Sequence, residues 1–461
     1  MMTRKLPIIA LATAPGKAGV GVIRISGPQL LPMIKALFNK ALPPRQANLL
    51  TLRDAQGESI DQLLAIYFSA PASFTGEDVL ELQCHGGPQL LELVMKRCLE
   101  LGKDQGLVIA EPGEFSLRAY LNNKIDLAQA EAIADLIDAQ SAAAVRGAAR
   151  SLQGVFSNNI NSLIEEITQL RILVESTLDF PEEEIEFLEN AQARERLSAV
   201  MHKLRALRDG AKQGKILRDG IQLVLAGAPN VGKSSLLNRL AGEEVAIVTP
   251  IAGTTRDRVK ESITIGGVPM HIIDTAGLRE TTDLVEAKGI ERSWEAIEAA
   301  DLVIFLQDPS SSDLAANAEI LELKTKILTA IPPRCPVLEV NNKLDLLANG
   351  PNPDQAEKQP LFISAKTGQG IETLKQKILE LAGWGGSQEG VIVARRRHLD
   401  CLDRAATHLE QSQQFAENGN ISLELFAEEL RLAQDQLGQI TGKLLPDDLL
   451  GKIFSQFCIG K

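Results

Sequence analysis

A glycine-rich loop that follows an apolar run is the feature that most constrains the fold of this chain. Residues 221–226 read Ile-Gln-Leu-Val-Leu-Ala, which is typical of a buried strand. They lead directly into residues 227–234, Gly-Ala-Pro-Asn-Val-Gly-Lys-Ser, which match the pattern G-x-x-x-x-G-K-[ST]. In this pattern backbone N–H groups surround phosphates, the lysine reaches the β- and γ-phosphates, and the serine hydroxyl binds Mg²⁺. A helix-like run follows at 235–240. The context therefore predicts a phosphate-binding loop in an α/β sheet.

Four further motifs follow in chain order, each beside an expected strand. They are Gly253-Thr254-Thr255-Arg256-Asp257, Asp274-Thr275-Ala276-Gly277, Asn342-Lys343-Leu344-Asp345 and Ser364-Ala365-Lys366. The first two can bind Mg²⁺ and sense a γ-phosphate. The carboxylate of the third can accept two hydrogen bonds from guanine, which adenine cannot supply, and backbone N–H groups of the fourth can reach the guanine oxygen. Because open α/β sheets bind ligands at the carboxyl ends of their strands, the five motifs together predict a guanine-nucleotide site.

The residue after Gly277 departs from the pattern of Ras-like GTPases. Those enzymes place a glutamine there to orient the attacking water, whereas this chain has Leu278, which cannot hydrogen-bond water. Either another group orients the water or hydrolysis is slow. The acidic candidates just downstream are Glu280, Asp283 and Glu286, and their chemistry alone does not choose among them.

The texture of the sequence changes three times, which predicts a multidomain chain. Residues 1–121 mix short apolar runs with a helical stretch, typical of an α+β domain. Residues 122–216 and 384–461 are helical, and in the first of these blocks helical periodicity runs from about residue 126 to residue 178 with few breakers. Residues 217–383 alternate strands with helices, and Gly266-Gly267 predicts a hairpin. An α/β unit flanked by helical blocks indicates that one domain is inserted into another.

Composition narrows the possible partners and the compartment. Lys and Arg total 48 and Asp and Glu total 60, so the formal net charge of −12 excludes a strongly basic nucleic-acid coat, although not a local basic patch. Aromatic residues make up only 4% of the chain, which argues against base stacking as the main activity. Five cysteines without a C-x-x-C pair favour a reducing compartment, the cytoplasm. No apolar run reaches the length of about 18 residues that a membrane span requires, so no membrane contact is expected.

His85, in Gln83-Cys84-His85-Gly86-Gly87, is a tempting ligand or base. It has no second histidine or aspartate at a useful sequence spacing. We therefore expect it to stabilise a turn or line a pocket.

The motifs resemble those of one family, the tRNA modification GTPases of the MnmE (TrmE) type, over essentially the whole chain. The matching strings lie at residues 227–235, 246–257 and 274–280 around the nucleotide site, at 74–82 and 112–115 near the N-terminus, and at 457–461. The resemblance implies an N-terminal α+β folate-binding and dimerisation domain, an all-α helical domain, and a Ras-like α/β P-loop G domain inserted into the helical one.

The resemblance also implies an activity and partners. Members of the family hydrolyse GTP and act as homodimers with a flavin-containing partner, MnmG (GidA), so the chain needs no flavin of its own. Together the two proteins place an aminomethyl-type group on C5 of the wobble uridine of certain tRNAs, using a one-carbon unit from 5-formyl-tetrahydrofolate or a related folate.

Carried over residue by residue, the family's nucleotide site has three parts. Ser234 and Thr255 would hold Mg²⁺, and Glu286 would be the catalytic acid that acts on the attacking water. A K⁺ ion that replaces an arginine finger would be held by Asn230, Thr249, Ile251 and Thr254. The nucleotide-binding residues would be Asn230, Val231, Gly232, Lys233, Ser234, Ser235, Thr249, Pro250, Ile251, Ala252, Gly253, Thr254, Thr255, Asp274, Thr275, Ala276, Gly277, Asn342, Lys343, Asp345, Ser364, Ala365 and Lys366.

The family's folate site maps to Arg24, Glu81, Lys124 and Lys461. The chemistry is suitable, because cationic side chains can pair with the glutamate carboxylates of folate and an acid can bind the pterin donors. Judged without the resemblance, each of these residues reads more simply as part of a surface ion pair. Cys458 corresponds to the family's C-terminal cysteine, which implies a functional thiol.

Two other functions remain open from the sequence. Leu278 is compatible with a GTP-dependent switch or scaffold that hydrolyses GTP slowly. A ribosome-assembly GTPase would carry a similar G domain, but such proteins usually have basic RNA-binding extensions, and the net charge of −12 argues against this alternative.

Overall fold

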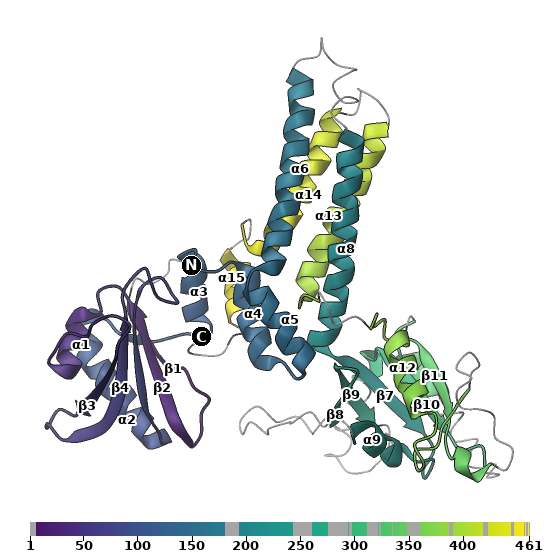
Figure 1. Cartoon of the computed structure of the whole chain (residues 1–461), viewed down its shortest axis with the longest axis horizontal. Coiled ribbons are helices and arrows are strands. Elements are labelled where there is room, and N and C mark those ends of the chain that lie inside the picture. Colours follow the sequence, from purple (N-terminus) through teal and green to yellow (C-terminus); the bar gives the residue numbers. More distant parts are fainter. Residues whose placement is uncertain are drawn as a thin grey trace. The chain divides into compact units, whose positions relative to one another are not determined.

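The computed structural model divides the chain into two compact units. The first comprises Met1–Ala134, Leu152–Leu197 and Thr407–Lys461, and the second comprises Asp135–Ser151 and Ser198–Ala406. The structure describes residues 6–179, 193–242, 261–274, 294, 297–310, 321, 324–333, 335–347, 360–386, 391–417, 423–443, 447–455, 457 and 460. Each unit contains one six-stranded sheet (Figure 1).

The sheet of the first unit is antiparallel except at one edge. Its order is β3-β4-β5-β2-β1-β6, and only β1 and β6 run parallel. The strands are β1 (Ile8–Leu11), β2 (Ala18–Gly27), β3 (Ala47–Arg53), β4 (Ser59–Phe68), β5 (Asp78–Gly86) and β6 (Val108–Ile109). Helices α1 (Leu31–Phe38) and α2 (Pro88–Gly102) cover one face, where alternate strand residues such as Leu80 and Leu82 meet Met33 and Val94 in a buried cluster. This is the predicted α+β texture.

Helices make up the rest of the first unit and continue into the second. They are α3 (Glu114–Leu121), α4 (Leu127–Asp138), α5 (Ala142–Leu152), α6 (Val155–Asp179), α8 (Ala193–Asp219), α13 (Arg396–Glu417), α14 (Leu423–Thr441) and α15 (Asp447–Phe454). The stretch 126–178, expected to be helical with few breakers, consists of three helices. Gly154, with φ of 85°, supplies a left-handed turn between α5 and α6 that other residues rarely adopt.

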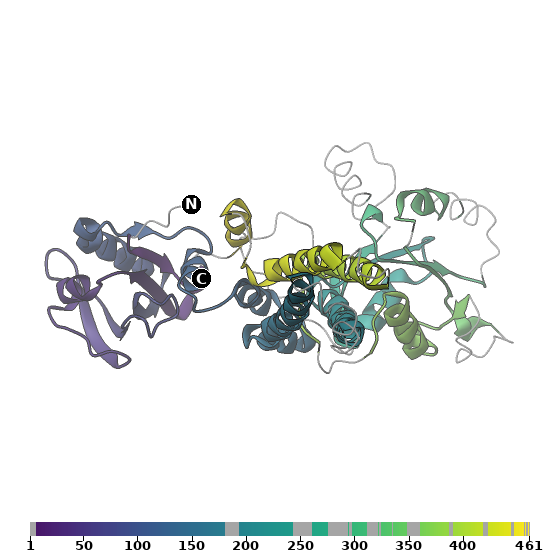
Figure 2. The same cartoon turned by 90° about the horizontal axis from the view of Figure 1, so that it is seen from above.

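Helices α6 and α14 lie side by side within the first unit (Figure 2). Gln434 joins them, because its Oε1 accepts a hydrogen bond of 2.9 Å from Arg171 and its Nε2 donates one of 2.8 Å to the Thr168 hydroxyl. At the end of the same unit, Phe454 and Phe457 pack with residues of α3 and α4. Within the described residues, none of the helices combines the length and the apolarity that crossing a membrane requires.

The sheet of the second unit is parallel except at one of its two edge strands. Its order is β12-β11-β10-β7-β9-β8, and β8 alone pairs antiparallel. The strands are β7 (Ile221–Gly227), β8 (Glu261–Ile265), β9 (Val268–Asp274), β10 (Leu302–Gln307), β11 (Val337–Asn341) and β12 (Leu361–Phe362), with helices α9 (Lys233–Ala241) and α12 (Ile371–Leu381). The predicted hairpin is confirmed, since Gly266 and Gly267 join β8 to β9 with φ of 57° and 83°.

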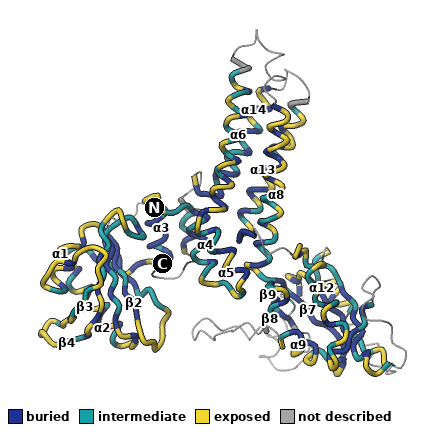
Figure 3. The backbone as a smooth tube through the Cα atoms, viewed as in Figure 1, coloured by how far each residue is buried: buried dark blue, intermediate teal, exposed yellow. Residues whose placement is uncertain are grey.

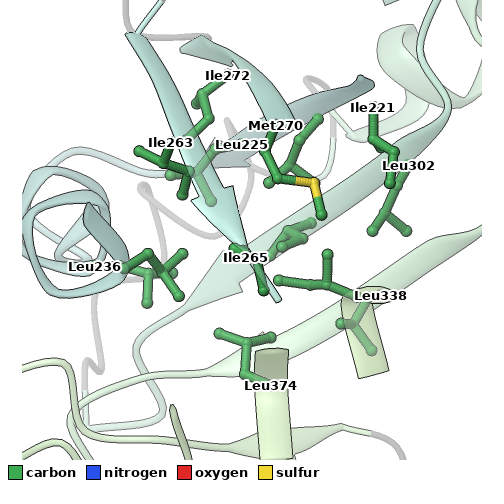
Figure 4. Packing of buried hydrophobic residues seen from close by; sticks show 14 of the residues in the cluster. Ile221, Leu225, Leu236, Ile263, Ile265, Met270, Ile272, Leu302, Leu338 and Leu374 are labelled. Carbon is green, nitrogen blue, oxygen red and sulfur yellow. The ribbon is translucent and has the colours of Figure 1, made fainter. Parts of the chain in front are cut away.

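Both faces of this second sheet are buried, as its apolar strands require. Along β7, Leu223 and Leu225 enter a cluster with residues of α9 and α12, while Val224 and Ala226 enter a separate cluster. The burial-coloured tube shows the strands in dark blue between more exposed helices (Figure 3). Leu236 of α9 and Leu374 of α12 point into the first cluster (Figure 4). The core therefore fixes where the strands end, and with them the loops that follow.

One buried carboxylate joins the two segments that lead into and out of this sheet. Asp135, near the end of α4, has a side chain that is only 6% exposed. Its Oδ1 accepts hydrogen bonds from Arg218 Nε at 2.7 Å and from the Arg395 guanidinium at 2.8 Å. Arg218 precedes β7 and Arg395 precedes α13, so Asp135 clamps the entry and the exit of the α/β segment within the second unit.

Candidate nucleotide-binding site

The glycine-rich loop joins β7 to α9 as predicted. At position 232 both the backbone conformation and a close neighbouring atom require a glycine. The φ of Gly232 is 97°, and a Cβ built on it would lie 2.4 Å from Asn342 Nδ2. Only glycine tolerates both the left-handed backbone and this close approach. Asn230, two residues earlier, is exposed and also left-handed, with φ of 63°. Its side-chain oxygen is therefore open to a ligand.

Lys233 holds its ammonium over the loop. Nζ donates hydrogen bonds to the carbonyl oxygens of Gly227 at 2.8 Å and Ala228 at 2.9 Å. Ser234 and Ser235 follow in the exposed first turn of α9. Because the first N–H groups of a helix lack intrahelical partners, a cation beside a helix N-terminus makes a site suited to phosphate.

Asn342 ties three loops together from a buried position. It is 2% exposed, and its Nδ2 donates a hydrogen bond of 2.8 Å to the carbonyl oxygen of Val231 in the glycine-rich loop. Its Oδ1 accepts one of 2.9 Å from the backbone N–H of Ala365, and its own N–H donates one of 2.8 Å to Gln307. The ends of β10, β11 and β12 are thereby held against the phosphate-binding loop.

The next residues of this motif are each oriented by a neighbouring strand end. Lys343, with φ of 64°, places its Nζ 2.6 Å from Asp308 Oδ2. Burial of Asp308 raises its pKa, but hydrogen bonds from Lys343 and Ser310 outweigh that effect, so the pKa of this carboxyl is lowered and it stays charged. Asp345 accepts a hydrogen bond of 2.6 Å from the Ser364 hydroxyl. A carboxylate fixed in this way is suited to read the edge of a purine.

The first unit brings together three of the predicted folate residues around one segment. Arg24 and Glu81 are register partners on β2 and β5, with Arg24 Nε 2.9 Å from Glu81 Oε1. The Arg24 guanidinium lies 5.9 Å from the centroid of the Phe74 ring. Lys124 Nζ donates a hydrogen bond of 3.0 Å to the carbonyl oxygen of Pro71. The segment 71–74 thus contacts both cationic side chains.

His85 has a carboxylate partner that the sequence reasoning missed. The ring Nδ1 lies 2.7 Å from Asp61 Oδ1, and the His85 backbone N–H donates to Oδ2 at 3.0 Å. Asp61 is buried, while the His85 side chain is 73% exposed. The partner stands 24 residues earlier on β4, so only the pairing of β4 with β5 brings the two together. The bonds join two neighbouring strands, so the turn-stabilising or pocket-lining role that we expect stays a prediction.

Comparison with known proteins decides the family. The family model for the N-terminus of the GTP-binding protein TrmE matches residues 7–124, and the model for the MnmE helical domain matches residues 127–458. The tRNA modification GTPase MnmE of Polynucleobacter asymbioticus is 77% identical over 100% of both chains, and that of Bordetella parapertussis is 56% identical over 100% of both. The chain belongs to the MnmE family of tRNA modification GTPases. Among solved structures, the G domain of the T. maritima FeoB iron transporter is 28% identical, covers 35% of this chain and 98% of that chain, and has a TM-score of 0.24.

Family membership confirms the resemblance and the fold class, with α+β, helical and α/β parts. The structure brings Asn342 into contact with Val231, Gly232 and Ala365. Lys233 contacts Gly227 and Ala228 of the same loop. Asp274 is the last residue of β9. Thirteen predicted residues lie outside the described part of the chain: Thr249, Pro250, Ile251, Ala252, Gly253, Thr254, Thr255, Thr275, Ala276, Gly277, Glu286, Cys458 and Lys461. Their roles in this MnmE-family chain stay predictions.

Asp308 is a site residue that the sequence reasoning missed. It follows the apolar strand β10 directly after Gln307, which is the position where the other motifs stand relative to their strands. Its place at a strand end was the available signal. No short motif contains it, so only the contact with Lys343 shows that it belongs to this edge of the sheet.

Proposed function

We propose that this chain hydrolyses GTP at the carboxyl edge of the second sheet and that this hydrolysis serves tRNA modification. The observation that carries the proposal is the Asn342 link, which holds the phosphate-binding loop against the two loops expected to read guanine. Lys233 would neutralise the phosphates, and Asp345, oriented by Ser364, would accept the guanine N–H groups. Ala365 and Lys366 would present their backbone to the guanine oxygen.

The donor atoms at this edge fit the cations that the family implies. Ser234 offers an exposed hydroxyl at the start of α9, and Thr255 would complete a set of oxygen ligands for Mg²⁺. Asn230, exposed and left-handed, would share K⁺ with Thr249, Ile251 and Thr254. When bound there, K⁺ would supply positive charge beside the β- and γ-phosphates. Glu286 would orient the attacking water, a task that Leu278 cannot perform.

The first unit would bind 5-formyl-tetrahydrofolate or a related folate. Arg24 and Lys124 each contact segment 71–74, and Glu81 pairs with Arg24, which supports a single binding region. Gly460 approaches the same sheet, since a Cβ built on it would lie 2.7 Å from the carbonyl oxygen of Leu11. Leu11 follows Ala10, which pairs with Arg24. This contact supports a role for Cys458 and Lys461 at the folate.

The chain would act in the cytoplasm as a homodimer with the flavoprotein MnmG (GidA), which would supply the flavin. Together they would add an aminomethyl-type group to C5 of the wobble uridine of certain tRNAs. The domain boundaries near residues 121, 216 and 383 belong to the same proposal.

Hydrolysis of GTP by the purified chain in K⁺ against Na⁺, at matched ionic strength with Mg²⁺, tests the GTPase part. We expect K⁺ to raise the rate about a hundredfold or more, because it takes the place of an arginine finger. Glu286→Gln should then lower the K⁺-dependent rate by about a hundredfold. Equal slow rates in both salts would contradict the K⁺ mechanism and favour the switch or scaffold.

A reconstituted reaction tests the second part. Unmodified tRNA, the flavoprotein, GTP, a folate one-carbon donor and an amine should give a C5-modified wobble uridine only when this chain is present. If the chain instead copurified with ribosomal precursors and left tRNA unchanged, the ribosome-assembly alternative would replace this proposal.

A further inference from the structure

The long helix α8 carries a positive net charge, whereas the long helices α6 and α14 are negative. Helix α8 contains eight Lys and Arg and three Asp and Glu, a surplus of five positive charges. Helices α6 and α14 each contain one basic and four acidic residues, a surplus of three negative charges apiece. The whole chain carries −12, so the residues outside α8 sum to −17. The positive surplus of α8 exceeds that of α5 and α9, which carry two positive charges each. In so acidic a protein, solubility does not explain such a helix.

The basic side chains of α8 form a continuous stripe beside its buried seam. Arg205, Arg208, Lys212 and Lys215 follow one another at intervals of three, four and three residues, which places them along one side of a helix over about 15 Å. Leu204, Ala211 and Leu217 are buried, and Arg205 and Lys212 are exposed. Arg208 and Lys215 are half-buried, so the stripe lies along the border between the buried seam and solvent.

Nearby carboxylates do not cancel this charge. Arg208 lies 3.5 Å from Asp403, Lys212 lies 3.9 Å from Asp209, and Lys215 lies 3.5 Å from Asp219. These contacts are 3.5 Å or longer, and in each of them at least one side chain is more than a third exposed. Such pairs are held together weakly in water. A polyanion can compete for the same cations at little cost.

The first turn of α13 extends the positive surface. Within the second unit, the segment before α13 packs on α8, because a Cβ built on Gly214 would overlap the carbonyl oxygen of Ile392. The Arg208–Asp403 contact joins α8 to α13, and the two helices run side by side (Figure 1). Arg396 is exposed and Arg397 half-buried directly after Arg395, which Asp135 holds. The chain thus places arginines of α13 beside the basic stripe of α8.

We propose that this basic α8 surface, made of Arg205, Arg208, Lys212, Lys215, Arg396 and Arg397, binds the sugar-phosphate backbone of the tRNA. The inference rests on the proposed function, since it names the surface by which that substrate is held. Arginine and lysine in a row match a line of phosphates. The surface contains no aromatic side chain to stack a base, so it recognises the shape of a folded RNA and not its sequence.

A triple neutralisation tests the surface in the full-length protein. Arg205→Gln, Lys212→Gln and Arg396→Gln remove three exposed charges that take no part in the nucleotide or folate sites. Affinity for an unmodified tRNA transcript, measured by fluorescence anisotropy over a salt series, should fall about tenfold or more at low salt. The slope of log Kd against log salt should fall by about two to three, since each lost phosphate contact removes about one.

Two control proteins separate a charge effect from damage. Lys35→Gln, Lys40→Gln and Lys103→Gln change the net charge equally at exposed positions of the first unit, and they should leave the tRNA affinity within about twofold of the unsubstituted chain. Arg205→Lys, Lys212→Arg and Arg396→Lys keep the charge and should retain both affinity and slope. In all three triple variants, GTP hydrolysis and the thermal midpoint should match those of the unsubstituted chain.

Three results would overturn the inference. The first is an unchanged tRNA affinity and salt slope in the neutralised protein. The second is no tRNA binding by the unsubstituted chain even at low salt. The third is loss of binding to the flavoprotein with tRNA binding intact, which would assign the surface to an acidic protein partner. If the reconstituted chain still modifies tRNA, these results leave the proposed function standing, whereas failure of modification by the unsubstituted chain would reject the proposed function itself.

Discussion

The first sheet, β3-β4-β5-β2-β1-β6, is antiparallel except at β6, whereas the second, β12-β11-β10-β7-β9-β8, is parallel except at β8. In the antiparallel sheet the polar pairs lie across neighbouring strands, as Arg24 does with Glu81. In the parallel sheet the polar residues of the nucleotide motifs lie beyond the strands, in the loops at their carboxyl ends. The two sheets have the same number of strands, but their candidate binding residues occupy different positions relative to the strands.

The difference follows from strand direction. Parallel strands all end at one edge, so residues as distant as Val231, Asn342 and Ala365 meet without any knowledge of register. Antiparallel strands end at alternate edges, so Arg24 meets Glu81 only because the register of β2 and β5 sets them opposite each other. A substitution at the polar residues of one sheet should therefore change the binding properties of that sheet and spare those of the other.

Lys233→Ala should have the largest effect. The ammonium lies over the glycine-rich loop, and removing it deletes the positive charge expected at the β- and γ-phosphates. We expect GTP hydrolysis to fall by about a hundredfold or more, with folate binding by the first unit unchanged. The matched control is Lys375→Ala on α12, whose Nζ lies 2.7 Å from Glu372. A Lys233→Ala protein with normal turnover would place the phosphates elsewhere.

Asn342→Ala should weaken both the second unit and its nucleotide affinity. The substitution leaves the Val231 carbonyl oxygen and the Ala365 N–H without their side-chain partner in a buried place, which costs about 2–4 kcal/mol. A lower thermal midpoint of the chain and faster release of a fluorescent guanine nucleotide are expected. Asn48→Ala, which removes an exposed hydrogen bond to Gln46, serves as the control. An unaltered midpoint would mean that the three loops are held by other contacts.

Arg24→Gln should act on the first sheet alone. It keeps a hydrogen-bonding group opposite Glu81 but removes the cation expected to pair with folate. Folate affinity, measured by calorimetry, should fall about tenfold while K⁺-dependent GTP hydrolysis is unchanged. Unchanged folate affinity would reduce the Arg24–Glu81 contact to an ordinary ion pair of the sheet.

The smallest effect concerns the two thiols on the buried side of the first sheet. Burial raises the pKa of Cys84 to about 12 and that of Cys98 to about 12. Iodoacetamide reacts with the thiolate form of cysteine. At neutral pH both residues should therefore be alkylated far more slowly than a solvent-exposed thiol, and readily only after the chain unfolds. Peptide mapping after timed alkylation measures this. Rapid labelling of either thiol in the folded chain would show that this face is not closed.

The sequence predicts that the glycine-rich loop and the motifs at the strand ends meet at one edge of a sheet, and the structure explains why. The short motifs have local geometry and contain Gly232, Lys233, Asn342 and Asp345. The parallel sheet then brings these motifs together, because its strands end at one edge. Asp308 and the His85–Asp61 pair were not foreseen, because each depends on a contact between residues far apart in the sequence. The positions of the two breaks that divide residues 126–178 into three helices were not predicted. One lies at residues 139–141, and the other at Gly154, a left-handed glycine that gives a weak signal in an alanine-rich stretch.

The central claim is that the carboxyl edge of the parallel sheet reads guanine, and Asp345→Asn tests it most directly. The carboxylate would accept hydrogen bonds from two N–H groups of guanine, whereas an amide can donate to the additional oxygen of xanthine. The affinities of the original chain and of the variant for GDP and for xanthosine diphosphate should be measured together. We predict that the variant loses affinity for GDP by about a hundredfold or more and gains affinity for xanthosine diphosphate. A variant that binds GDP as tightly as the original chain would contradict the account.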